Sequence, residues 1–499
     1  MRIMKNQKML MVLSRGGRVF VLLTALSAII LSALFIGGCA TNPATGKKTL
    51  SLISESQEIN MGKQSDKEIS ASLGVYPDQD LEQYISELGK RLAATSERPN
   101  LPWTFRVLDD PTVNAFALPG GYIYVTRGIL TYLNDEAELA GVIGHEIGHV
   151  TAMHAVQRIS SQQLLQLGLG IGMVVAPELQ QYGQFIGAGL GVLFLKFSRD
   201  DENQADSLGL RYMGKAGYDP RQMTQVMAML DRVSKSEGGG RIPEWLSTHP
   251  DPGNREDKIQ TQVARMNINF EESVVSRERY LDVIDGIVFG NNPREGIFRK
   301  NVFYHPDLQF LYVFPENWKM SNMKQAVMAV SPNQDAVIQI TISKETSHEA
   351  AADKFFTQQG VTAENVKKGE INRLPSVTGG FRVKTDQGIL SGSVAFVAYG
   401  GDVYQILGYS TLQAWPGYQQ AVDRSMYSFE QLIDGEILSV QPMRIRIVAL
   451  ERDMTIEEFA DSYSSPVSVD TLALINQVNR DTVLTEGQKI KQVVGKKVQ

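Results

Sequence analysis

His145, Glu146 and His149 form the pattern H-E-x-x-H, whose residue types and spacing suit a metal-dependent hydrolytic site. The two histidines are four positions apart, so on a helix of about 3.6 residues per turn they lie on one face and can bind the same ion. Neutral imidazole is a good zinc ligand. Glu146 lies beside the first histidine, where it can take a proton from water that the metal activates. The pattern therefore predicts one Zn²⁺ per chain.

The residues around this pattern favour a buried helix. The run Asn134-Asp135-Glu136 offers an N-cap followed by acidic residues in the first turn. Apolar residues then recur at helical spacing, at Leu139, Val142, Ile143 and Val150. A five-residue pattern also arises by chance, and this helical context is what favours a metal site.

A catalytic zinc site needs a third protein ligand and an open fourth position. Glu202 is the candidate ligand, and Asp206 lies one helical turn further on. If Glu202 binds the metal, Asp206 can accept a hydrogen bond from a ligating histidine and fix its tautomer. The alternative is the acidic, solvated start of a helix, since Asp200 and Asp201 are also charged. Downstream of H-E-x-x-H, the ligand interpretation is favoured.

These motifs together resemble the gluzincin metallopeptidases of the HtpX, CaaX prenyl endopeptidase and BepA type. The resemblance covers roughly residues 51–284 and rests on four motifs in order: His145-Glu146-x-x-His149, Glu202-x-x-x-Asp206, the segment Asn114–Val125, and Ser247-Thr248-His249-Pro250 followed by Arg255. It implies a mainly α-helical zincin fold with a small β-sheet, zinc held by His145, His149 and Glu202, and endopeptidase activity. It also implies a role near the metal for His249.

The role of His249 has two interpretations. Proline residues flank its loop, so the loop can be held stiffly over the cleft, where His249 would gate the metal. Alternatively, His249 or Arg255 could stabilise the developing oxyanion. His154 is excluded, because five residues after His149 it should point about 140° away from the ligand face. His305 and His348 lie outside the matched region.

The segment 114–125 predicts a strand, a Pro-Gly-Gly turn and a second strand. An edge strand beside the metal could bind an extended peptide by strand addition. The expected substrate-binding residues are Asn114, Gly120, Gly121 and Tyr122. The alternative is a purely structural hairpin.

The N-terminal residues predict a bacterial lipoprotein signal. Residues 1–18 carry five basic residues and no acid, and residues 19–38 are uncharged and mostly apolar. The apolar run is long enough for an uncleaved membrane anchor. Cys39, the single cysteine, stands where a lipobox places the lipidated residue. Residue 40 is alanine rather than the aspartate that is associated with retention in the inner membrane. By resemblance to bacterial lipoproteins, cleavage before Cys39 and a periplasm-facing position on the outer membrane are expected.

Composition excludes some classes of function and stabilisation. A single cysteine leaves no internal disulfide, so stability must come from packed cores. The net charge is −6, and removal of the five basic residues of 1–38 brings it to −11. A protein with this net negative charge is not expected to bind nucleic acid.

The length of 499 residues, 43% hydrophobic, suits a multidomain chain. Residues 39–285 should form the protease domain, with a helix marked by Leu81, Tyr84, Ile85, Leu88 and Leu92. Two Gly-rich apolar stretches, 164–176 and 185–197, are shorter than the roughly 20 residues of a membrane-spanning helix. They favour a helical hairpin that is buried in the protein or touches a membrane, the buried form being preferred.

Two further domains are expected after a linker at 286–300. Residues 301–440 predict an α+β domain with strands near 310–314, 327–330, 337–343 and 393–399 and helices near 348–359 and 418–432. Phe314-Pro315-Glu316-Asn317-Trp318 resembles the start of PsbP-like domains. Residues 441–499 resemble a small α/β LysM module, a type that binds peptidoglycan. Its usual opening Gly-Asp-Thr is replaced around Arg452 and Met454, which puts glycan binding in doubt.

The favoured hypothesis is a lipid-anchored zinc metalloendopeptidase acting in quality control. Its expected partners are unfolded or misassembled envelope proteins, the membrane through the lipid at Cys39, and peptidoglycan through the C-terminal module. The alternative is a non-catalytic envelope chaperone or peptidoglycan-tethered scaffold with a latent zinc site. The presence of Glu146 argues against this alternative, since a structural zinc site needs ligands but no base.

Overall fold

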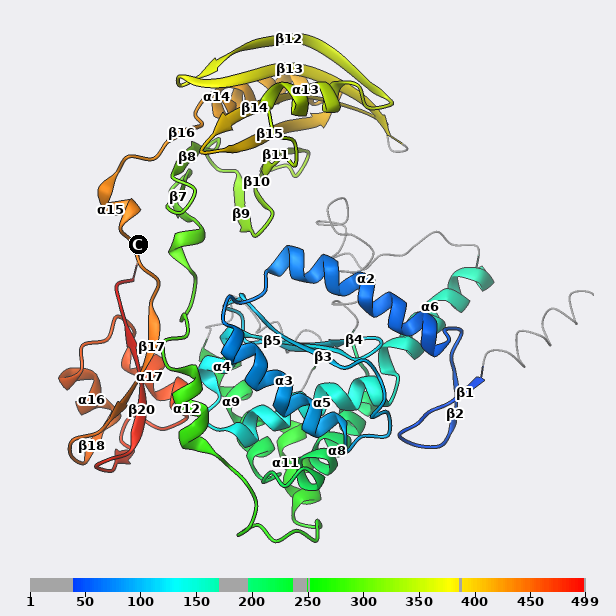
Figure 1. Cartoon of the computed structure of the whole chain (residues 1–499), viewed down its shortest axis with the longest axis vertical. Helices are drawn as coiled ribbons and strands as arrows, with labels where there is room; N and C mark the ends of the chain where they lie inside the picture. Colours follow the sequence, from blue (N-terminus) through cyan, green and yellow to red (C-terminus); the bar gives the residue numbers. More distant parts are fainter. Residues whose placement is uncertain (1–38, 170–195, 237–248, 250–251, 386–387, 498–499) are drawn as a thin grey trace, which may run out of the picture.

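The computed structural model describes residues 39–169, 196–236, 249, 252–385 and 388–497 (Figure 1). The expected signal segment, 1–38, lies outside these residues, as does most of the two Gly-rich stretches at 164–176 and 185–197. Within the described ranges, no helix combines the length and hydropathy needed to cross a bilayer.

The first region is mainly helical and contains a small sheet, as predicted. The sheet has the order β3-β5-β4, in which β5 pairs with β3 in parallel and with β4 in antiparallel register. The five apolar residues expected on one helix all lie buried on α3. The elements are β1 (Cys39–Thr41), β2 (Lys48–Leu50), α2 (Glu55–Leu73), α3 (Gln79–Ala93), β3 (Thr104–Leu108), β4 (Ala115–Leu118), β5 (Tyr122–Thr126), α4 (Arg127–Tyr132), α5 (Glu136–Thr151), α6 (His154–Leu169), α8 (Arg199–Lys215), α9 (Gln222–Ser236), α11 (Pro252–Val263) and α12 (Arg277–Ile284).

The middle region is an antiparallel α+β domain with its own hydrophobic core. Its larger sheet has the order β12-β13-β14-β15-β11-β10-β9, and its smaller one β16-β8-β7-β6. The elements are η2 (Pro293–Glu295), β6 (Ile297–Arg299), β7 (Val302–His305), β8 (Phe310–Val313), β9 (Lys319–Met323), β10 (Ala326–Val330), β11 (Ala336–Ile342), α13 (His348–Phe356), β12 (Val361–Ile371), β13 (Leu374–Thr385), β14 (Gly388–Tyr399), β15 (Asp402–Thr411), α14 (Trp415–Met426), β16 (Glu430–Gln431) and α15 (Gly435–Leu438).

Strands lie at the four predicted positions and helices near the two predicted ones, although α14 ends at Met426 rather than near residue 432. The remaining strands of the two sheets were not predicted, among them β12. Most of this strand is exposed and carries charged residues on both faces, so it lacks the alternation of apolar and polar residues that marks a half-buried strand. The predicted linker, 286–300, also needs correction. It contains η2 and β6, so the sheet of the middle domain begins before residue 301.

The C-terminal region packs against the first. Its strands β17 (Arg444–Ala449) and β20 (Lys489–Val494) are antiparallel neighbours, and the helices α16 (Ile456–Ser462) and α17 (Val469–Ile475) lie between them in the chain. The short strands β18 (Met454–Thr455) and β19 (Val483–Leu484) also pair. These elements fall where the LysM resemblance placed helices and strands. The LysM assignment itself stays a prediction.

Candidate metal centre

Helices α5 and α8 pack closely because glycines lie where the helices meet. A Cβ on Gly148 would come within 2.9 Å of the carbonyl oxygen of Ala205, and one on Gly209 within 3.0 Å of the backbone nitrogen of His145. The expected N-cap of α5 is confirmed, since the side chain of Asp135 accepts a hydrogen bond from the backbone N–H of Glu138. The close approach brings Glu202 of α8 against the two histidines of α5.

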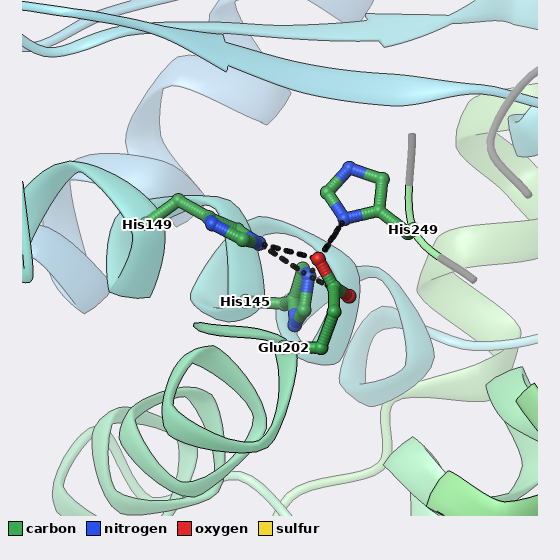
Figure 2. A group of neighbouring side chains, drawn as sticks. All are labelled: His145, His149, Glu202 and His249. Carbon is green, nitrogen blue, oxygen red and sulfur yellow. Dashed lines mark hydrogen bonds and ion pairs between the residues drawn. The ribbon is translucent and has the colours of Figure 1, made fainter. Parts of the chain in front are cut away.

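Four buried side chains converge at this contact: His145, His149, Glu202 and His249 (Figure 2). One nitrogen or oxygen of each lies within 4.8 Å of the others. The Nε2 atoms of His145 and His149 are 3.0 Å apart. Glu202 Oε2 lies 3.6 Å from Nε2 of His145, and Glu202 Oε1 lies 3.4 Å from Nε2 of His149. The three ligands predicted from the sequence are therefore together.

These separations fit a tetrahedral zinc ion. Zinc–nitrogen and zinc–oxygen bonds of about 2.0–2.1 Å place neighbouring ligand atoms about 3.3 Å apart. Burial also lowers the pKa of His145 to about 3, so this ring is neutral and can act as a ligand. Two imidazoles and a carboxylate are the donor set that a catalytic zinc site uses. The residues present fit the metal.

Nδ1 of His249 lies at the fourth corner of the group. It is 2.9 Å from Glu202 Oε1 and 3.4 Å from Nε2 of His145. The other ring nitrogen, Nε2, lies 3.7 Å from Glu146 Oε1. Figure 2 shows the imidazole of His249 beside the Glu202 carboxylate, across the group from His149. His249 can therefore reach both a metal ion and the expected base.

Glu146 is buried next to the ligand group. Its Oε1 atom has no hydrogen-bond partner among the residues that the structure describes. Burial raises the pKa of Glu146 to about 7, with His149 opposing that rise. A carboxylate with a pKa near neutrality can both accept and return a proton.

Asp206 and Arg255 contact the ligands His145 and Glu202 and keep them in place. Asp206 Oδ1 lies 2.9 Å from Nδ1 of His145, as predicted for a residue that fixes the tautomer of a ligand. Arg255 donates to both oxygens of Asp206, at 2.8 and 2.6 Å, and forms an ion pair with Glu202 at 2.8 Å. Burial alone would raise the pKa of Asp206, but Arg255 and His145 hold it below its usual range. The oxyanion role expected for Arg255 stays a prediction; Arg255 contacts the carboxylates of Asp206 and Glu202, and its Nη2 lies 3.4 Å from Nδ1 of His145.

His154 lies outside the ligand group, as expected, but it contacts a ligand, which the helical projection did not indicate. Its Nδ1 atom lies 2.9 Å from Nδ1 of His149, and its Nε2 atom lies 2.8 Å from Oε1 of Gln204. The helical projection failed because α5 ends at Thr151 and α6 begins at His154, with Met153 between them at φ 60°. The local sequence carries no glycine or proline at this break, so no strong signal pointed to it.

The predicted hairpin is present as β4 and β5, whereas its role in binding substrate stays a prediction, and the expected binding residues lie mostly away from the sheet edge. β4 is one of the two edge strands of the sheet, whereas Tyr122 lies on the central strand β5. A Cβ on Gly120 would come within 2.7 Å of the Cα of Ile59 in α2, so this glycine is covered by α2. Gly121 packs in the same way near Trp103, and Asn114 pairs with Thr126. The pairing edge therefore belongs to Ala115–Leu118.

A small pocket joins this edge to the ligand group. Its lining includes Ala117, Leu118 and Pro119 from the edge strand and its turn, together with His149 and Phe197. The strand edge and a metal ligand therefore share one hollow.

Comparisons with known proteins identify the family. The model of peptidase family M48 matches residues 79–263, which include both histidines of α5 and Glu202. The mitochondrial metalloendopeptidase OMA1 of Schizosaccharomyces pombe is 31% identical over 236 residues, which cover 46% of this chain and 68% of that protein. The chain belongs to peptidase family M48.

Other M48-type relatives match the same part of the chain. The beta-barrel assembly-enhancing protease of Yersinia pestis is 29% identical over 262 residues, covering 49% of this chain and 53% of that protein. The mitochondrial metalloendopeptidase OMA1 of Arabidopsis thaliana is 36% identical over 209 residues, covering 41% and 40%. The chain thus spans about half the length of these curated relatives. Residues 79–263 form a metalloendopeptidase domain, and M48 metallopeptidases depend on zinc.

Proposed function

We propose that this chain is a zinc-dependent endopeptidase in which Glu146 is the general base. The observation that carries the proposal is the convergence of His145, His149 and Glu202 beside the buried carboxylate of Glu146, which lies outside the ligand group. A structural zinc site needs four ligands and no base, whereas a catalytic site has three protein ligands and a base.

The residues of the chain account for the proton movements of the reaction. Zinc, when bound by the three ligands, would activate water and polarise the scissile carbonyl. Glu146 accepts the proton of the attacking water at Oε1 and then returns a proton to the leaving amine. Its pKa of about 7 suits both steps. Asp206 and Arg255 keep His145 and Glu202 in place during the reaction.

Two substitutions distinguish the role of Glu146 as the base from the role of Glu202 as a metal ligand. Glu146→Gln should reduce cleavage of unfolded casein by about 10²–10⁴-fold and leave zinc content near one ion per chain. Glu202→Ala should lose both zinc and activity, because it removes one of three ligands. Full activity in Glu146→Gln would overturn the mechanism. A parent protein that binds zinc but cleaves nothing would favour the non-catalytic scaffold.

We further propose that His249 keeps the enzyme latent. With Nδ1 at 2.9 Å from Glu202 and 3.4 Å from His145, its ring stands where the fourth ligand of zinc would be. In that position the ring excludes the attacking water. His249→Ala should therefore retain zinc and cleave casein faster than the parent. A rate that falls about 100-fold would instead support hydrogen bonding to the oxyanion.

Substrates are proposed to bind as an added strand along β4. The support is that β4 is an edge strand of its sheet and that the pocket at its end reaches His149. Main-chain pairing places few demands on side chains, which suits unfolded chains as substrates.

The proposed setting is the bacterial envelope, with unfolded or misassembled envelope proteins as substrates. The support is the lipobox-like position of Cys39 and a relative named beta-barrel assembly-enhancing protease.

Two experiments test the proposed setting. Cys39→Ser should abolish labelling by radioactive palmitate and leave a slower-migrating precursor. A variant that is still labelled would remove the lipid anchor from the proposal. Peptidoglycan binding by residues 441–499 is testable by sedimentation with purified sacculi.

A further inference from the structure

His154 contacts a metal ligand although it lies outside every motif that marked the site. It is 4% exposed and begins α6, just after the break at Met153. Its two ring nitrogens have different neighbours. Nδ1 lies 2.9 Å from Nδ1 of His149, and Nε2 lies 2.8 Å from Oε1 of Gln204 on α8.

The neighbours of Nε2 determine where the proton of His154 lies. The amide oxygen of Gln204 can only accept a hydrogen bond, so Nε2 of His154 carries the proton. Asp201 Oδ1, 3.7 Å from the same nitrogen, favours the same arrangement. In a neutral imidazole the other nitrogen then has a free lone pair. Nδ1 of His154 is therefore an acceptor.

The proton between the two rings must then belong to His149. The two Nδ1 atoms are 2.9 Å apart, a separation that requires one donor and one acceptor. With the proton on its Nδ1, His149 has its lone pair on Nε2. That Nε2 is the atom 3.0 Å from Nε2 of His145 and 3.4 Å from Glu202, inside the ligand group.

We propose that His154 is a positioning residue which, held by Gln204, fixes His149 in the tautomer that presents Nε2 to the metal. The inference rests on the proposed zinc site. The two ligands are thus supported differently. His145 donates to the carboxylate of Asp206, which Arg255 in turn binds, whereas His149 donates to a neutral imidazole. Helix α8 contributes to the support of both histidines, because it carries Asp206 and Gln204 as well as the ligand Glu202.

The test compares zinc affinity among variants of the full chain, measured by competition with a chelator. His154→Phe keeps an aromatic ring beside Phe197 but removes the acceptor. It should weaken zinc binding by about 10–100-fold, the usual effect of losing a partner of a ligand. His154→Gln can again accept from His149 and should recover most of the affinity. His305→Phe, in the middle domain, is the matched control and should bind zinc as the parent does.

Two further measurements separate positioning from folding. The melting temperature in EDTA should be the same for His154→Phe and the parent, while the rise in melting temperature on adding zinc should shrink. In metal-free protein carrying ¹⁵N-labelled histidine, the parent should show His149 protonated at Nδ1. His154→Phe should shift this ring toward protonation at Nε2, a change that a purely structural role would not cause.

The outcomes decide between the hypotheses. If the parent binds no zinc, the proposed function fails. If the parent binds zinc and His154→Phe binds it equally well, the role of His154 is overturned. Should His154→Phe melt early in EDTA, Gln204→Leu takes its place, because it leaves both histidines intact. Weaker zinc binding in Gln204→Leu would then support the proposal, and parental affinity would overturn it.

Discussion

The two regions that follow the M48 domain are attached to it in different ways. The C-terminal region, from β17 to β20, contributes to the same hydrophobic core as α3, α5 and α9. The middle domain has separate cores, formed by residues between 297 and 437. Among the described residues, it is joined to the first region chiefly by an ion pair between Lys324 and Asp109. One region is thus part of the protease fold, and the other is carried beside it.

The C-terminal region supports the start of the helix that carries the metal ligands. Gln477 donates to the backbone oxygen of Tyr132 and to Glu138 Oε2. Lys491, which is fully buried, donates to the backbone oxygens of Thr131 and Leu133. These contacts surround the N-terminus of α5, whose other end carries His145 and His149. The position of the metal ligands therefore depends on a segment more than 300 residues away in the chain.

Deletions should give the largest difference between the two regions. Ending the chain at Val440 removes part of the shared core, so the M48 domain should lose its cooperative unfolding transition and its zinc. Replacing residues 297–440 by a short Gly-Ser linker should preserve both. That excision is feasible because residues 286–289 run beside 443–447, and Arg294 donates to the backbone oxygen of Leu438 (Figure 1). Calorimetry and metal analysis would measure the result.

The deletion comparison also has a clear contrary outcome. If the chain ending at Val440 melts cooperatively at the parental temperature and binds zinc, the C-terminal region is not part of the protease fold. If the excised protein unfolds instead, the middle domain contributes stability that its contacts do not account for.

Lys491→Met should produce the next largest effect. The substitution leaves two buried carbonyl oxygens without their donor, each at a cost of about 1–3 kcal/mol. We expect a loss of about 2–6 kcal/mol in the free energy of unfolding, measured with urea. Lys489→Met is the control on the same strand. Its ammonium pairs with Glu278 and Asp282 at the surface, so Lys489→Met should reduce the free energy of unfolding far less than Lys491→Met does. Equal losses in the two variants would contradict the docking role of Lys491.

The sequence predicted the ligands well because their positions follow from local helix geometry. His145 and His149 share a face at a spacing of four, and Glu202 and Asp206 do the same on α8. It did not indicate the contact between His154 and His149, since that contact follows from the break after Thr151, where Met153 adopts a left-handed conformation without a glycine or proline to mark it. Likewise, no local pattern indicates that Lys491 is buried. An isolated module of this kind would expose that side chain, and only docking against α4 and α5 covers it.

The middle domain should show a pH dependence of its own through His305. Burial lowers the pKa of this histidine to about 4, from an ordinary value of 6.5, and its Nδ1 accepts a hydrogen bond from the backbone of Leu308. The unfolded chain therefore takes up the proton first, and stability is constant above pH 6.5. As the pH falls from about 6.5 to about 4, the domain should lose on the order of 3 kcal/mol.

Calorimetry of the full chain across this range would follow the transition of the middle domain. His305→Phe should flatten the dependence, because the titrating group is gone. A middle domain whose melting temperature falls equally in the parent and in His305→Phe would assign the effect to other groups.

The smallest effect is expected at the ion pair between the two regions. Lys324 binds Asp109 of the first region at 2.7 Å and also binds Glu295; the Asp109 carboxylate is buried, whereas Lys324 and Glu295 are partly exposed. Because the Asp109 carboxylate keeps its ion pair with Arg127 at 2.6 Å and Lys324 is partly exposed, Lys324→Met should change the free energy of unfolding by less than about 1 kcal/mol. It should nevertheless free the middle domain to move, since this pair is the chief polar contact that holds it beside the protease. Small-angle X-ray scattering should then report a larger radius of gyration, and high salt should enlarge the parent protein in the same way.

Lys354→Met is the control. It breaks a comparable ion pair with Glu345 inside the middle domain and should leave the radius of gyration unchanged. A loss of stability above about 2 kcal/mol in Lys324→Met, with no change in radius, would mean that the middle domain is as firmly attached as the C-terminal region.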